Sequence, residues 1–161
     1  MTTQQFAAWV EPWAQSYSDV RREGAARART ATAAELSQAT GDEGWTVREE
    51  LLHLAASDTD FIDALGAMVD GRTPDTDVFI DIDARNKRNL AKWQSRSMED
   101  VASALEHNIG TLHGLLGRLT ADDERRRPDG IPLEIGQLVK GYGQHSPYHL
   151  AQIRDALARA D

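Results

Sequence analysis

The sequence predicts an all-α protein, an antiparallel four-helix bundle with short extra helical segments. Long segments carry apolar residues at intervals of three and four, which is the period of one helix face. Residues that typically begin and end helices stand at the boundaries of these segments. The four main helices are joined by short connections, and a chain of 161 residues suits one core. We therefore expect a single domain over residues 1–161.

The first two long helices are expected in the first half of the chain. The first covers residues 3 to about 29, and Pro12 predicts either a kink in it or a later start. The second starts after Thr46, which forms a capping box with Glu49 and so satisfies free backbone N–H groups. It ends near Gly71, because glycine tolerates the left-handed conformation of a helix cap.

Two more long helices and one short helical segment are expected in the second half. Residues 78–82 fit either a short strand or an extended arm, and a helical stretch follows over about 83–93. Ser97 then caps a helix from 98 to about 119. After a turn at residues 128–130, the last helical region covers about 133–160.

Composition disfavours or excludes several classes of function. The formal net charge of −8 disfavours nucleic acid, whose phosphates it would repel. No apolar run approaches the roughly 18 residues of a membrane span, and the first residues do not resemble a signal peptide. We therefore expect a cytoplasmic protein with no membrane partner. The absence of cysteine excludes a thiolate zinc site and a cysteine nucleophile, so any thiol must come from outside the chain.

Three of the five histidines form the candidate functional site. His145 and His149 are four residues apart, so both lie on one face of a helix, and neighbouring apolar residues turn this face toward the core. His53 lies on the flank of an apolar stripe, which suits either the lip of a cavity or a partly exposed residue without a role. Three imidazoles would make a metal site with open positions. We expect His107 and His113 at the surface.

Pro147, between the two late histidines, leaves two backbone geometries open. A proline inside a helix removes the hydrogen bond to residue 143 and crowds that carbonyl, although Gly143 gives the backbone room to bend. Either the helix kinks, or a new helix starts with Ser146 as its cap. In the second case His145 leaves the i, i+4 geometry and the metal site is altered or lost.

Two segments resemble the DinB/YfiT-like superfamily. Trp45-Thr-Val-Arg-Glu-Glu-Leu-Leu-His53-Leu is similar to a W-[ST]-x-[KR]-E-x-x-x-H-[LI] pattern, and His145-Ser-Pro-Tyr-His149-Leu-Ala-Gln-Ile153 to an H-x-x-x-H-x-x-Q-[IL] pattern. The resemblance implies a four-helix bundle with a divalent metal, commonly zinc or nickel, on His53, His145 and His149. It also implies a homodimer and, in several branches, a low-molecular-weight thiol such as bacillithiol, mycothiol or glutathione.

Other residues are candidates for catalysis or support. Asp60 stands seven residues after His53 on nearly the same face and could accept a proton. Tyr142 lies one turn before His145 and points inward, and Gln152 could donate to a group that supports the site. Solvation or core packing is the alternative for each. We expect the tryptophans to pack in the core or at a dimer interface; they are Trp9, Trp13, Trp45 and Trp93.

The function favoured by the sequence is a metal- and thiol-dependent transferase that acts on small electrophiles as its small-molecule substrates. A metal-dependent hydrolase with bound hydroxide as nucleophile is a second hypothesis. A third is a non-catalytic binding or sequestration bundle. The sequence alone does not decide whether the protein is an enzyme.

Overall fold

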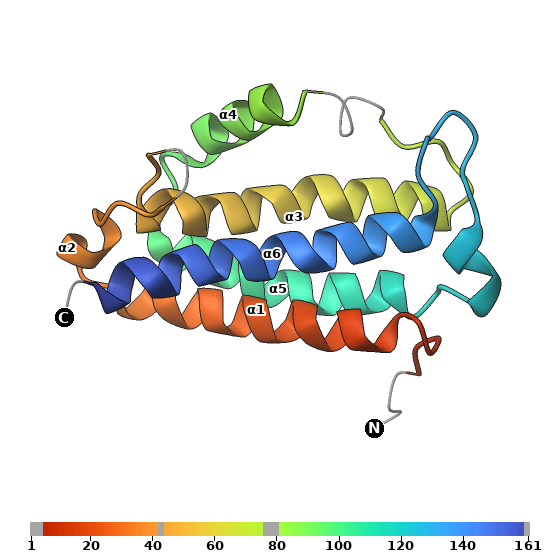
Figure 1. The fold of residues 1–161 in the computed structure, drawn as a ribbon, viewed down its shortest axis with the longest axis horizontal. Coiled ribbons are helices and arrows are strands. Elements are labelled where there is room, and N and C mark those ends of the chain that lie inside the picture. Colours follow the sequence, from red (N-terminus) through yellow and green to blue (C-terminus); the bar gives the residue numbers. More distant parts are fainter. Residues whose placement is uncertain (1–4, 42–43, 76–80, 160–161) are drawn as a thin grey trace.

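The computed structural model describes residues 5–41, 44–75 and 81–159, and most of these residues are helical (Figure 1). Four long helices form the bundle: α1 (Glu11–Thr30), α3 (Val47–Val69), α5 (Met98–Leu116) and α6 (Ile135–Ala158). Two short helices, α2 (Ala33–Leu36) and α4 (Ile82–Trp93), and the 3₁₀ helix η2 (Ala121–Arg125) complete the fold. The predicted all-α bundle is confirmed.

Each long helix has two long neighbours, one on either side. α1 packs beside α5 and α6, and α3 packs beside the same two helices. The pairs α1–α5 and α3–α6 are antiparallel, as expected, whereas α3–α5 and α1–α6 run parallel (Figure 1). Parallel neighbours need a crossover connection. The chain between α3 and α5 provides it, and α4 lies against α3 within this crossover.

The helix boundaries follow the expected chemistry. Thr46 and Glu49 form the predicted capping box, Ser97 caps α5, and Gly71 has a φ of +71° after α3. α1 begins at Glu11 with Pro12 in its first turn, so the later of the two predicted starts is observed. Of the segment expected as a strand or arm, residues 78–80 lie outside the described residues, and Ile82 begins α4.

The core consists of two apolar clusters with a polar layer between them. The first cluster includes Val47, Leu51, Leu105 and Ile153, and the second includes Phe61, Leu65, Leu112 and Val139. The residues of the polar layer come from all four long helices and form one hydrogen-bonded network; they are Arg21, Asp58, Asn108 and Tyr142. The layer lies beside the three candidate histidines, since His145 follows Tyr142 by one turn of α6.

α6 continues without a break through Pro147. Gly143 is the residue whose carbonyl the proline ring crowds, and its missing side chain leaves room for Trp13 of α1. A Cβ at Gly143 would lie 2.4 Å from the Trp13 ring. The alternative in which a new helix starts at Ser146 is therefore wrong, and His145 and His149 keep the i, i+4 relationship within one helix.

The sequence also predicts core or surface positions for the tryptophans and for His107 and His113. Trp9, Trp13 and Trp93 pack against the two clusters, as expected for core residues. His107 is exposed, also as expected. The surface position expected for His113 is wrong, because this half-buried side chain lies 2.6 Å from Ser18 Oγ and contacts the Phe6 ring edge-on. Among the described residues, no helix is long and apolar enough to cross a membrane.

Candidate metal centre

His53 of α3 and His145 and His149 of α6 meet between these two helices. Nε2 of His145 lies 3.2 Å from Nε2 of His53 and 3.0 Å from Nε2 of His149. A potential ligand atom from each residue lies within 4.8 Å of the others. Nitrogens bound at about 2.0–2.1 Å to a tetrahedral zinc ion stand about 3.3 Å apart. The three histidines therefore have a spacing that suits a divalent cation.

Glu50 fixes the orientation of His149. Its Oε2 accepts a hydrogen bond from Nδ1 of His149 over 2.7 Å, and its Oε1 accepts one from Thr40 Oγ1 over 3.0 Å. Glu50 is fully buried, one helical turn before His53. A proton on Nδ1 of His149, shared with Glu50, leaves Nε2 on the side of the centre, which is the arrangement a metal ligand requires.

The imidazoles of His53 and His145 are held in the neutral form that binds metals. Burial, together with the neighbouring histidines and Arg85, lowers the pKa of His53 from 6.5 to about 2. Burial, His149 and Arg85 lower the pKa of His145 to about 3. Neither side chain has a hydrogen-bond partner at Nδ1. His149 is thus the one member of the triad that a carboxylate anchors among the described residues.

Aromatic rings enclose the centre. Trp45 packs on His53 with ring centroids 5.0 Å apart, and it stacks on His149 at 6.0 Å. Tyr142 stacks on His145 from the other side, at 5.7 Å and an interplanar angle of 21°. These ring contacts help to keep the imidazoles in their observed orientations.

Asp58 is the hub of the polar layer beside the triad. Its carboxylate is fully buried and ion-paired with Arg21, whose side chain is also buried. Tyr142 donates its hydroxyl proton to Asp58 Oδ1 over 2.6 Å, and Asn108 donates to Oδ2 over 2.9 Å. Burial and the Asp58 carboxylate raise the pKa of Tyr142 well above its usual range. These contacts balance the buried charge.

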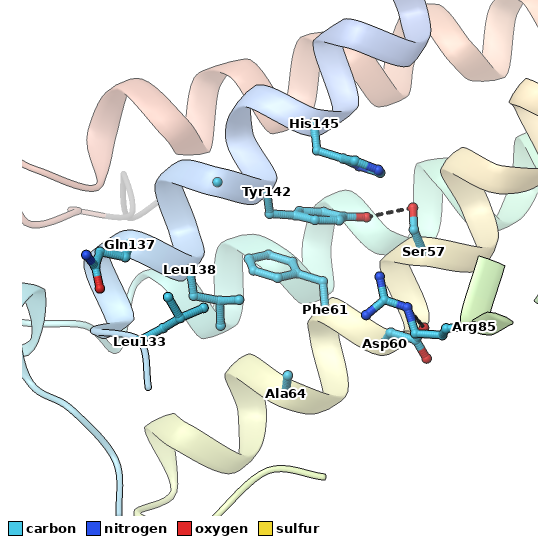
Figure 2. Close-up of a pocket in the computed structure, with 11 residues that line it drawn as sticks. Ser57, Asp60, Phe61, Ala64, Arg85, Leu133, Gln137, Leu138, Tyr142 and His145 are labelled. Atoms are coloured by element: carbon cyan, nitrogen blue, oxygen red, sulfur yellow. Dashed lines mark hydrogen bonds and ion pairs between the residues drawn. The ribbon is translucent and has the colours of Figure 1, made fainter. Parts of the chain in front are cut away.

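A pocket of about 220 Å³ opens directly against His145 (Figure 2). Phe61, Ala64, Leu133 and Leu138 provide apolar walls, and the Tyr142 ring stacks on Phe61 with centroids 4.0 Å apart. Among the described residues, the charged lining consists of Asp60 and Arg85. The pocket therefore joins a polar end, at the histidines and this charged pair, to an apolar end between α3 and α6.

The structure brings together most, but not all, of the predicted site residues. His53, His145 and His149 converge, and Asp60 and Tyr142 both line the pocket. Asp60 Oδ2 accepts from Asn89 over 2.7 Å and lies 3.3 Å from Arg85 Nε. Gln152 is placed elsewhere, against the loop at Gly41, where an added Cβ would meet its Oε1 at 2.9 Å.

Three features of the site were missed by sequence reasoning. Glu50 carried a usable signal, because it precedes His53 by three residues and so shares its helix face. Arg21 follows Tyr17 by one turn on the buried side of α1, which marks it as a charge that needs a partner. Nothing in the helix periodicity indicated Arg85, since its position depends on how α4 packs across α3.

Comparison with known protein families gives a match over most of the chain. A family model described as the DinB superfamily matches residues 16–153, a span that includes all three histidines and Glu50. No curated protein and no solved structure gives a significant match. Since the matched span covers most of the chain and the histidines suggested by the resemblance converge in space, the chain belongs to the DinB superfamily.

Proposed function

We propose that the protein is a divalent-metal-dependent transferase that joins a low-molecular-weight thiol to a small electrophile. The observation that carries this proposal is the convergence of three imidazoles beside a pocket. His53, His145 and His149 would hold the metal, for which zinc and nickel are the proposed identities. When bound, such a cation favours the deprotonated form of a thiol and so makes it nucleophilic.

The surrounding residues have distinct roles in this proposal. Glu50 keeps the Nε2 lone pair of His149 directed at the centre. Trp45 covers one side of the imidazoles and excludes water there. The apolar walls at Phe61 and Leu138 hold the carbon body of the electrophile. Tyr142 positions the carboxylate of Asp58 with its hydroxyl and shapes the pocket with its ring.

Group transfer also requires a destination for the thiol proton. We assign it to the carboxylate of Asp60, which lines the same pocket as His145. The sulfur forms a bond to the electrophilic carbon, the bond from that carbon to its leaving group breaks, and the leaving group departs with the electron pair. We also propose a cytoplasmic location, because thiols stay reduced there. A homodimer is proposed as the oligomeric state.

The test combines metal content with turnover. Protein purified without a histidine tag should bind about one zinc or nickel ion per chain and consume thiol together with a small electrophile. His53→Ala, His145→Ala and His149→Ala should each lose the metal and the activity, whereas His107→Ala, at an exposed position, should keep both. No metal uptake by the native protein would overturn the proposal. Turnover without any thiol would instead identify a hydrolase.

A further inference from the structure

The pocket beside His145 has one positively charged side chain in its lining. Arg85 comes from α4, and its guanidinium points toward the space in front of Tyr142 and His145 (Figure 2). The side chain is 18% exposed, so it is largely withdrawn from bulk water. An arginine in such a place binds carboxylates well, because its planar N–H groups match the two carboxylate oxygens.

The carboxylate of Asp60 lies beside this guanidinium. Arg85 Nε lies 3.3 Å from Asp60 Oδ2, and Asn89 donates to the same oxygen over 2.7 Å. The contact to Asp60 uses the Nε end of the guanidinium, while the terminal nitrogens face the pocket in Figure 2.

We propose that the pocket binds a small organic carboxylate, whose carboxylate pairs with Arg85 and whose apolar body lies against Phe61 and Leu138. This assignment rests on the proposed function, because it names the class of molecule that reacts there. At about 220 Å³ the pocket is smaller than the roughly 300–1,000 Å³ of sites for drug-sized ligands. Its ligand is therefore a molecule with one short apolar body and one anionic group.

The direct experiment measures binding of 3-phenylpropionate and of its neutral analogue, 3-phenylpropionamide, to metal-free protein by calorimetry. The two probes share the same apolar body and differ in charge. We expect the carboxylate to bind at least about tenfold more tightly than the amide, as for other charge-assisted hydrogen bonds. Equal binding of the two probes would overturn the proposal.

Substitutions identify the residue responsible. Arg85→Gln should bring the two probes within about twofold of each other, while Arg88→Gln, at an exposed position on the same helix, should keep the preference. Asp60→Asn removes the competing negative charge and should strengthen carboxylate binding. A preference that survives Arg85→Gln would overturn the assignment of Arg85. Misfolding would lower the affinity for the carboxylate. A higher affinity in the Asp60 variant can therefore not be caused by misfolding.

The metal-free measurement separates this inference from the proposed function. If the native protein binds the carboxylate but takes up no metal, the anion site stands and the transferase proposal fails. If it takes up metal and turns over thiol but does not distinguish the probes, the transferase proposal stands and the anion site fails. To place the carboxylate in the reaction, two substrate pairs are compared, an acidic and a neutral electrophile and then an acidic and a neutral thiol. The pair whose kcat/KM difference disappears in Arg85→Gln carries the recognised group.

Discussion

Nδ1 of His149 donates to Oε2 of Glu50 across 2.7 Å, and both side chains are buried. This contact selects the imidazole tautomer whose Nε2 lone pair faces His53 and His145. Glu50→Gln removes the charge and allows the amide to turn its NH₂ toward His149, so we expect zinc affinity to fall by about 10- to 100-fold. Competition with a chromophoric chelator measures the change.

A matched control for this substitution lies one residue earlier. Glu49→Gln retains the capping box with Thr46, because glutamine serves equally well at that position. Its zinc affinity should equal that of the native protein. If Glu50→Gln also bound zinc with native affinity, the carboxylate would have no part in orienting the ligand.

Gly143→Ala should destabilise the bundle. The new Cβ would stand 2.4 Å from the Trp13 ring, so the ring or α6 must shift, at a cost of about 1–3 kcal/mol in the free energy of unfolding. Urea denaturation measures it. Gly141→Ala is the matched control, since its Cβ meets nothing within 4 Å and the change should stabilise the helix by about 0.5–1 kcal/mol. Equal effects at both positions would contradict the close contact with Trp13.

Tyr142→Phe separates a structural hydroxyl from a reacting one. The hydroxyl donates to Asp58 and lies 3.1 Å from Ser57 Oγ, so its removal takes a hydrogen bond from each of these buried side chains. We expect a loss of about 1–3 kcal/mol of stability in urea unfolding. A loss of turnover of about 100-fold or more at unchanged stability would instead show that the hydroxyl takes part in the chemistry.

The metal-free protein should lose stability as the solution becomes acidic. The pKa values of His53 and His145 are lowered from 6.5 to about 2 and about 3, so the unfolded chain binds their protons first. Stability is therefore complete above about pH 6.5 and falls toward pH 3, by up to about 1.4 kcal/mol per pH unit for each histidine.

The histidine effect is best measured between pH 6.5 and 5 by urea titration in the presence of a chelator. Carboxyl groups with lowered pKa values, such as Glu23, contribute at lower pH, because they lose stability only when they become protonated. His145→Asn should reduce the slope in this window by about half. A flat profile in the native protein would mean that the two histidines accept protons freely in the folded state.

The sequence predicts the helices better than it predicts how they are arranged. Period, capping residues and glycines predict all four long helices because these signals act within a few residues. The parallel packing of α3 beside α5 depends on the path of the crossover. Local periodicity gives no information about that path. The position of Arg85 in the pocket was not predicted for the same reason, because it depends on the packing of α4.

For the metal centre, the histidines were available from spacing and resemblance, but the state of the Pro147 turn was not. A proline interrupts a helix in general, and only the structure shows that α6 continues through this one. The network around Asp58 was equally hidden. Its four residues are spread over 122 positions from Arg21 to Tyr142, and no local sequence pattern predicts that they contact one another.

The polar layer sets the axial register of the bundle, and this has a kinetic consequence. Arg21, Asp58, Asn108 and Tyr142 tie one point on each long helix to the others, so a slip of one turn, about 5.4 Å, would leave buried charges unpaired. His53 and His145 lie within two turns of these points on their own helices. The network therefore keeps the three imidazoles at the same height along the bundle. If they hold a metal, we expect its capture to be a simple bimolecular encounter whose rate rises in proportion to ion concentration, with no slow folding phase.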